Sequence, residues 1–426
     1  MKKRTEITVK HVTRVEGHGG IHIVVADGSV EKVEWQVPEA PRFFEAMVRG
    51  RNFQDIQTVV SRICGICSVT HSFAALKAIE AAFGVTISRQ TELLRILTLY
   101  GEHLESHALH IGFLAAPDFF GAASIFPLAQ SQPAFVKSVM GIHRLGNDMM
   151  ERLGGRMTHP VSFRVGGMCM LPSVETMRAL MKKIEDQVKP LESLVEEARG
   201  FLDRIPDFQR ETEYVAVRRP GLYSIYDGEV ASSDAADGIL PAGFEAAVRE
   251  YIPPMSTAKW ARLHRESYAT GALARFNLNG ALLLPRAKKA ASALGLDRRR
   301  HNPFMNTIAQ IVECVHIVEH AAVLLDEMLE RGMEREHYPV VSPQAAVGAA
   351  CVEAPRGTLF HKYAFDERGN CVAANLIIPT NQNHANIQKD LEALVAEHAN
   401  DPEERVKQWA EMLVRAYDPC ISCSTH

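Results

Sequence analysis

Two short cysteine pairs are the residues of this sequence best suited to bind a metal. The first pair is Cys64 and Cys67, and the second is Cys420 and Cys423, three residues before His426 at the end of the chain. Two residues separate the thiols within each pair, so both sulfurs of a pair can bind one ion. The pairs lie 356 positions apart (420 − 64). A shared site would therefore require the fold to bring distant parts of the chain together.

Four thiolates are soft ligands that suit zinc, nickel or iron–sulfur clusters. Three interpretations compete: a structural zinc site, a redox dithiol and a catalytic transition metal. A structural zinc usually closes a small local fold, whereas this loop would span almost the whole chain. Because loop-closure entropy rises only slowly with length, spacing alone leaves zinc open.

Residues near the two pairs favour a site in which the protein adjusts the chemistry of the bound metal as well as binding it. His71 lies one helical turn after the first pair, where its ring N–H could reach a sulfur. A glycine-rich loop over 14–20 supplies the carboxylate of Glu16. The guanidinium of Arg356 follows Pro355, which should hold it rigidly.

A second candidate metal site lies on the helix predicted over 90–114. It carries Glu102, His103, Glu105, His107 and His110, and the spacing of the three histidines places their imidazoles on one helix face. Glu and His on bundle helices can bind two irons, and partners could come from Glu313, His316, Glu319 and His320. The alternative is that these histidines are hydrogen-bonded in a helical core or line the main site.

The composition is that of an ordinary soluble enzyme. The 426 residues are 46% hydrophobic and 23% charged, with a formal net charge of −4, which does not suggest nucleic acid as a partner. The sequence contains no uninterrupted apolar run of about 18 residues, so we do not expect a membrane span. No apolar core of a signal peptide follows the basic start of the chain. We therefore expect a cytoplasmic protein, although a partner subunit could carry an export signal. The isolated cysteines should be buried small hydrophobes, namely Cys169, Cys314, Cys351 and Cys371.

Hydrophobic periodicity predicts a mainly α fold with β-hairpin regions near both ends. We expect one elaborated catalytic domain over 1–426. It would comprise a β region over 1–40, a helical body over 41–335 with an irregular stretch at 215–255, a β region over 345–380, and helices with a metal-binding tail over 381–426. The irregular stretch is the candidate for an inserted lobe or a subunit contact. Helices are predicted over 41–60, 68–83, 90–114, 131–152, 174–204, 304–332, 383–398 and 402–416.

Five stretches spread along the chain resemble the large, catalytic subunit of nickel–iron hydrogenases. They are Arg14–His18, Arg62–His71, Ser106–His110, Glu353–Gly357 and Asp418–His426. The resemblance covers nearly the whole chain and implies that family's fold, with long central helices, and heterolytic cleavage of dihydrogen. It is nearest to the cytoplasmic, cofactor-coupled branch, of the sulfhydrogenase or methyl-viologen-reducing type.

Within that branch the subgroup signals conflict. The tail from Asp418 resembles the sulfhydrogenase type, whereas Ala374–Asn383 resembles the heterodisulfide-reductase-linked type. Uptake enzymes usually have Trp after the motif formed here by Pro379 and Thr380, but this chain has Asn381. The resemblance therefore leaves the electron acceptor open.

The resemblance also implies a role for each cysteine. Cys64 and Cys420 would bind nickel terminally, and Cys67 and Cys423 would bridge nickel to an iron that carries carbon monoxide and two cyanides. Of the two candidates for first proton acceptor, a guanidinium is a poor base, so we favour the thiolate of Cys420. Glu16 would then pass the proton outward.

Further residues would surround this centre by the same resemblance. Arg356 and Thr380 would hydrogen-bond the cyanides, next to Pro355, and Asp118 and Asp418 would pair with Arg356. A magnesium ion would be bound by Glu45, the Leu376 carbonyl and the His426 ring, mostly through waters. His107 and His110 would be structural and face a neighbouring subunit.

The partners follow from the cysteine count and the resemblance. The four isolated cysteines are too scattered to bind an iron–sulfur cluster, so electrons should leave through a small subunit that carries one. Flavin- or nucleotide-binding subunits or a heterodisulfide-reductase partner are further expectations. The family trims a longer precursor after the last His, so the end at His426 suggests a mature form, a maturation protease and metal-insertion chaperones. The remaining alternatives are a non-catalytic relative in respiratory complex I, which lacks the nickel cysteines, and a structural zinc protein.

Overall fold

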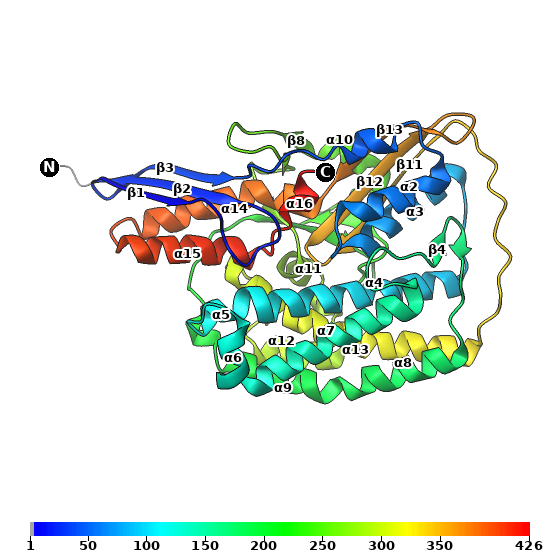
Figure 1. Ribbon diagram of the computed structural model, residues 1–426, viewed down its shortest axis with the longest axis horizontal. Helices are drawn as coiled ribbons and strands as arrows, with labels where there is room; N and C mark the ends of the chain where they lie inside the picture. Colours follow the sequence, from blue (N-terminus) through cyan, green and yellow to red (C-terminus); the bar gives the residue numbers. More distant parts are fainter. Residues whose placement is uncertain (1–3) are drawn as a thin grey trace.

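The computed structural model describes residues 4–426. At its N-terminal end an antiparallel sheet extends from the body of the molecule (Figure 1). Its strands are β1 (Arg4–Val9), β2 (Gly20–Ala26) and β3 (Ser29–Gln36). Asp27 and Gly28 both have positive φ, 52° and 75°, as a tight two-residue hairpin turn requires. The β region predicted over 1–40 is confirmed within the described residues by these three strands.

Long helices form the lower layer of the molecule in Figure 1. The central pair, α4 (Arg89–Leu109) and α7 (Pro133–Gly154), packs so closely that a Cβ on Gly146 would lie 2.5 Å from the Gly101 carbonyl oxygen. A π-helical turn, His110–Ala115, continues α4. The layer also contains α5 (Ala116–Phe119), α6 (Ile125–Ser131), α8 (Val174–Asp186), α9 (Val188–Arg199), α11 (Ala272–Asn279), α12 (Pro285–Ala293) and α13 (Asn306–Arg331).

Two predicted helices are each divided in the structure. Residues 41–60 form α1 (Phe44–Val48) and α2 (Phe53–Val60), because Gly50 has a φ of 77° and its N–H bonds to the Cys371 carbonyl. Residues 174–204 form α8 and α9, which break at Gln187, shortly before Pro190. Proline lacks the N–H needed to continue the preceding helix.

A second antiparallel sheet packs on α3 (Ser68–Phe83), which follows the first cysteine pair. Its strands are β11 (Ala346–Ala354), β12 (Gly357–Phe365) and β13 (Cys371–Ile377). These strands, with the turn over 366–370 between β12 and β13, lie in the β region predicted over 345–380. A second turn was not predicted: Ala354 pairs with Gly357, so Pro355 and Arg356 alone join β11 to β12.

The stretch over 215–255 is irregular only in part, with turns and loops over 219–228, 233–240 and 252–255. It contributes to a sheet of β6 (Glu213–Arg218), β7 (Glu229–Ser232) and β10 (Tyr268–Ala269), and to a hairpin of β8 (Arg249–Tyr251) and β9 (Trp260–Arg262), with α10 (Pro241–Ala247) alongside. Val215, Val217 and Phe244 form a second hydrophobic cluster with Phe360 of β12. Burial of these side chains explains why the stretch is ordered into strands.

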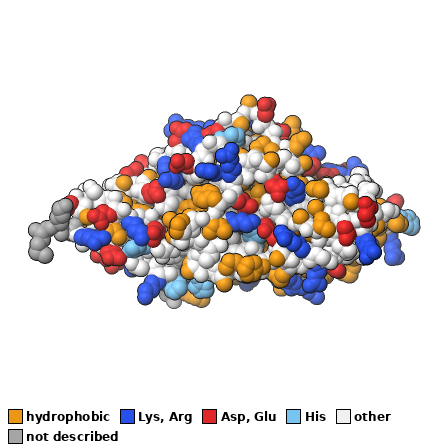
Figure 2. Space-filling view, turned by 90° about the horizontal axis from the view of Figure 1, so that it is seen from above, with side chains coloured by type: hydrophobic (Ala, Val, Ile, Leu, Met, Phe, Trp, Pro, Cys, Tyr) orange, Lys and Arg blue, Asp and Glu red, His pale blue; other side chains and the backbone are white. Residues whose placement is uncertain are grey.

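The C-terminal segment returns to the middle of the molecule (Figure 1). It comprises α14 (Pro379–Glu397), α15 (Glu403–Ala416) and the short α16 (Ile421–Ser424). Acidic and basic side chains are interspersed over the face shown in Figure 2. Among the described residues one helix, Pro303–Arg331, is long and apolar enough to cross a membrane, but 78% of its most apolar window is buried inside the molecule.

Candidate metal centre

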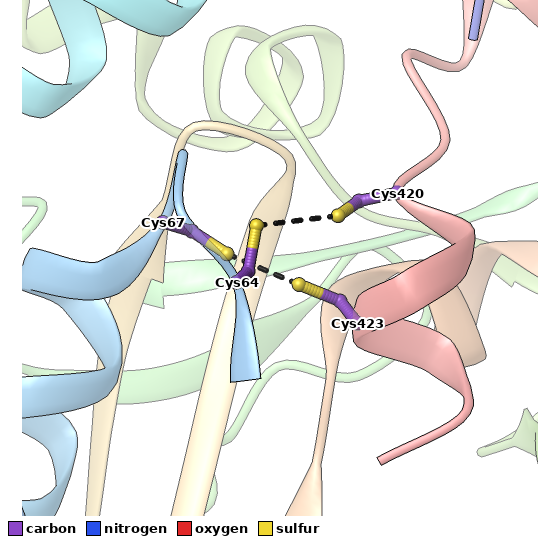
Figure 3. Close-up of side chains that lie close together, drawn as sticks. All are labelled: Cys64, Cys67, Cys420 and Cys423. Atoms are coloured by element: carbon purple, nitrogen blue, oxygen red, sulfur yellow. Dashed lines mark hydrogen bonds between the residues drawn. The ribbon is translucent and has the colours of Figure 1, made fainter. Parts of the chain in front are cut away.

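All four cysteines of the two pairs meet in one buried site (Figure 3). The sulfurs of Cys64, Cys67, Cys420 and Cys423 lie within 4.8 Å of one another. Two close approaches cross between the pairs: 3.5 Å from Cys64 to Cys420 and 3.1 Å from Cys67 to Cys423. A disulfide has a bond of about 2.05 Å, so these are free thiols in the geometry of a metal site.

Two of these cysteines are positioned by the helices that begin at them. Cys67 is the N-cap residue of α3, where its carbonyl accepts the first helical hydrogen bond from His71 N–H, and Cys420 caps α16. Hydrogen bonds from Cys420, Cys423 and Cys67 hold the pKa of Cys64 well below its usual range, while burial raises the pKa of Cys423. One thiolate is thus stabilised by neighbouring thiols, and metal binding would displace the remaining protons.

Arg42 ties the two cysteine turns together, and sequence reasoning missed it. Its terminal NH2 nitrogen donates to the carbonyl of Ile63 (2.5 Å), next to the first pair, and to the carbonyl of Ser422, inside the second. Its backbone N–H donates to the Thr425 carbonyl at 2.6 Å. No motif or spacing marks this arginine, because its acceptors are backbone carbonyls.

Arg356 projects from the tight turn between β11 and β12 toward the second pair. Its Nε donates to the Asp418 carbonyl (2.8 Å), one terminal nitrogen to Asp418 Oδ1 (2.8 Å) and the other to Ser106 Oγ (3.0 Å). Burial disfavours the charge, but the Asp418 carboxylate and the cysteine sulfurs hold the pKa of Arg356 well above its usual range. The structure thus places a fixed cation beside the thiolates.

Asp118 does not pair with Arg356, so that prediction is wrong. Its carboxylate accepts from Arg14 (2.5 Å) and, in a bidentate pair, from Arg415 (2.7 and 2.9 Å). The π-turn and the short α5 carry Asp118 to the loop of Arg14 and the end of α15, away from the β11–β12 turn. Asp418 is therefore the carboxylate that holds Arg356.

Glu16 reaches the second cysteine pair from the N-terminal loop. Its Oε2 lies 3.1 Å from Cys420 Sγ and accepts the Ser422 N–H at 2.9 Å, while its carbonyl accepts the Ile421 N–H at 3.0 Å. The loop needs glycine at position 17, since φ is 80° and a Cβ would lie 2.6 Å from Ile421 Cβ. The half-buried Glu16 side chain connects the sulfur to the outside.

A small cavity opens beside the sulfurs. Its wall combines apolar side chains with Arg356 and Thr380, and it is lined by Cys67, His71, Ala354, Leu359, Ile378, Pro379, Cys420 and Cys423. Thr380 lies in the first turn of α14 and accepts the Cys420 N–H at 3.1 Å, so its hydroxyl proton can be donated elsewhere. Three of the four cysteines, Cys67, Cys420 and Cys423, line this cavity, and Cys64 does not.

A second cluster of donor atoms lies beside this site, where Glu45, Leu376 and His426 converge. His426 Nε2 is 2.9 Å from the Leu376 carbonyl oxygen and 3.6 Å from Glu45 Oε1, and its Nδ1 is 3.1 Å from the Cys423 carbonyl. Burial raises the pKa of Glu45, but interactions with His426 and Lys259 outweigh it and lower the pKa to about 2. A carboxylate, a carbonyl and an imidazole could together hold a cation.

The histidines of α4 do not form a metal site. His107 Nε2 bonds to Glu313 (2.8 Å), whose carboxylate is also held by Arg275 through two hydrogen bonds. His110 bonds to Gln310 and the Arg415 carbonyl. Both histidines are fully buried, so the prediction that they face a neighbouring chain is wrong. Within residues 4–426 the cysteine cluster is the one group of three or more His, Cys, Asp or Glu side chains close enough to share an ion.

The isolated cysteines are mostly as predicted. Cys314, Cys351 and Cys371 are buried, but Cys169 is exposed. Cys169 follows the two-residue strand β5 (Gly167–Met168), and its N–H bonds to the Ser162 carbonyl, which leaves the side chain on the surface.

Comparisons with known proteins agree with this site. A family model described as nickel-dependent hydrogenase matches residues 42–140 and 256–426, and one described as HoxL-like matches residues 6–40. The alpha subunit of sulfhydrogenase 1 from Pyrococcus furiosus is 32% identical over 99% of this chain and 97% of that protein. A chain of the F420-non-reducing hydrogenase from Methanothermobacter thermautotrophicus is 30% identical over 99% of this chain and 94% of that protein.

A solved structure supports the same assignment. The H2-reduced NAD+-reducing [NiFe]-hydrogenase superposes with a TM-score of 0.87 and 29% identity over 100% of this chain and 99% of that one. The family match, the full-length relatives and the buried tetrathiolate site agree with one another. The chain therefore belongs to the nickel-dependent hydrogenase family, as a large, catalytic subunit.

Proposed function

We propose that Cys64 and Cys420 bind nickel terminally and that Cys67 and Cys423 bridge it to an iron. The observation that supports this assignment is the cavity beside the sulfurs, which borders both proposed bridging sulfurs, Cys67 and Cys423, and also Cys420, but not Cys64. The roles within each pair follow the resemblance to the family. By resemblance to the family, an iron bound there would carry one carbon monoxide and two cyanides. The lining suits such ligands chemically, since Arg356 and Thr380 offer donors to anionic cyanides.

When bound, the nickel–iron centre would supply the redox-active metals at which dihydrogen is cleaved heterolytically. The protein's own part is to receive and remove the proton. Cys420 Sγ would take it up, since the adjacent Arg356 guanidinium stays charged and is a poor base. Glu16 Oε2, 3.1 Å from that sulfur, would accept the proton next and pass it outward through its exposed edge.

Arg356 would act by position and charge. Three hydrogen bonds to Asp418 and Ser106 fix the guanidinium before substrate arrives. A preorganised charge in a buried site stabilises developing charge without reorganisation during the reaction. Pro355 contributes by restricting the turn that presents Arg356.

Glu45, the Leu376 carbonyl and the His426 ring would bind magnesium, mostly through waters. Oxygen ligands suit that ion. The ion would lock His426 against the end of α16, because His426 Nδ1 already bonds to the Cys423 carbonyl. Its role would be to support the second cysteine pair.

Electrons would leave through a small subunit with an iron–sulfur cluster. The cysteines outside the two pairs do not form a cluster site in the described part of the chain. One relative is named an NAD-reducing hydrogenase, which supports a nucleotide-binding partner. By resemblance to the family we also propose a flavin-binding subunit or a heterodisulfide-reductase subunit. We propose a cytoplasmic enzyme, matured by a protease and metal-insertion chaperones.

The deciding experiment combines metal analysis with turnover. The purified complex should contain about one nickel and one iron per chain at this site, show infrared bands of metal-bound CO and cyanide, and catalyse hydrogen-dependent dye reduction. Replacing Cys423 by Ser should remove nickel and activity together, whereas Cys314→Ser, a buried cysteine elsewhere, should keep both. About one zinc and no nickel per chain would overturn the proposal in favour of a structural tetrathiolate.

A further inference from the structure

A continuous hydrogen-bonded chain of three side chains ends at the sulfur of Cys423. His71 Nε2 lies 3.9 Å from Cys423 Sγ, and His71 Nδ1 lies 3.1 Å from His361 Nε2. His361 Nδ1 in turn lies 2.8 Å from the hydroxyl of Tyr363. The three side chains come from α3 and β12, and each is fully buried.

Only one arrangement of protons satisfies every atom of this chain. The Tyr363 hydroxyl has no hydrogen-bond partner other than His361 Nδ1 among the contacts of the described residues, so its proton must be donated to that nitrogen, and a neutral ring then carries its one N–H on Nε2. If Tyr363 donates to His361, then His361 donates to His71 and His71 donates to the sulfur. The reverse order would leave the buried Tyr363 proton without an acceptor and turn a ring lone pair toward the thiolate.

We propose that Tyr363 and His361 are positioning residues which, through His71, direct an N–H at the bridging sulfur of Cys423 and so reduce its electron donation to the metals. This inference rests on the proposed role of Cys423. The chain ends inside the protein at Tyr363, for which no further hydrogen-bond partner lies among the contacts of the described residues. It therefore fixes a set of dipoles at the sulfur and does not conduct protons.

The test is Tyr363→Phe in the intact enzyme complex, with Tyr100→Phe as the matched control. Tyr100 is also buried and its hydroxyl also contacts a histidine Nδ1, that of His320 at 2.6 Å. Loss of the Tyr363 donor should weaken the N–H at the sulfur, so the thiolate donates more charge and the CO stretching band moves to lower wavenumber. Tyr100→Phe should leave the band in place, with the same nickel content in both variants.

A second measurement reads the ring protons directly. Nitrogen-15 spectra of histidine-labelled enzyme should show His71 and His361 both with the proton on Nε2, and Tyr363→Phe should change the His361 signal. An unshifted CO band in Tyr363→Phe with full nickel, or a proton on Nδ1 of either ring, overturns the inference. Absence of nickel from the unaltered enzyme would instead overturn the proposed function, so the two failures are distinguishable.

Discussion

Replacing Arg356 by Lys should leave the metal site assembled but slow hydrogen turnover on the order of 100-fold. The guanidinium makes three hydrogen bonds, two to Asp418 and one to Ser106. A lysine ammonium keeps the charge but cannot hold all three acceptors in that geometry. A hydrogen bond to a charged group contributes about 1.5–3 kcal/mol, and a barrier increase of about 2.7 kcal/mol corresponds to about 100-fold in rate.

The assay is hydrogen-dependent dye reduction, normalised to nickel content. Arg415→Lys is the matched control, since Arg415 is equally buried and forms a bidentate pair with Asp118 away from the cavity. It should lose stability to a similar degree and keep its turnover per nickel. Turnover per nickel in Arg356→Lys equal to that of the unaltered enzyme would refute the role of the oriented guanidinium, and nickel loss would show that Arg356 is needed for assembly.

Three further predictions address the proton path, the pH dependence and the packing. Glu16→Gln should retain nickel and slow turnover, since the amide keeps the Ser422 contact but cannot carry a proton from Cys420; nickel loss would make Glu16 structural. Burial lowers the pKa of His384 to about 3, so the unfolded state binds the extra proton below pH 6.5 and stability falls as pH drops. This histidine should account for a loss of about 2 kcal/mol in the free energy of unfolding between pH 7.5 and 5. Urea unfolding at both pH values should show a loss smaller by that amount in His384→Gln than in the unaltered protein. An equal pH dependence in both proteins would contradict this role of His384. Gly146→Ala should destabilise the protein by about 1–3 kcal/mol, because its Cβ would lie 2.5 Å from the Gly101 carbonyl; an unchanged urea midpoint would show that α4 and α7 can separate freely.

Local patterns in the sequence predict most of the framework. The strands over 5–37 alternate clearly, and α13 is long and amphipathic, so period and length identify both without tertiary information. The short strands β6 and β10 escape prediction because they pair across about 50 residues, and a strand of two to six residues is specified mainly by what it packs on. The helix predicted over 41–60 failed at Gly50, where contacts with the β12–β13 turn override helix propensity.

In the candidate site, too, local sequence patterns predict some features, whereas others depend on the tertiary fold. Cysteine spacing and the adjacent His71 identify the ligands, since ligand geometry imposes a local pattern. The choice between Asp118 and Asp418 as the partner of Arg356 depends on where α5 and α15 lie, which no local pattern encodes. Arg42 acts on backbone carbonyls, and Tyr363 acts through another side chain, His361. Neither kind of contact produces a recognisable residue spacing in the sequence.

The position of Arg42 has a consequence for how the centre would lose its metal. One guanidinium nitrogen binds carbonyls in both cysteine turns, so neither turn can open while the other stays in place without breaking a buried, charged hydrogen bond. Partial opening, in which two ligands dissociate while two remain, is thereby disfavoured. Metal escape would require a larger cooperative opening that separates the N-terminal and C-terminal halves of the site. Retention of the metal is then set by the rate of that rare opening rather than by the affinity of each thiolate.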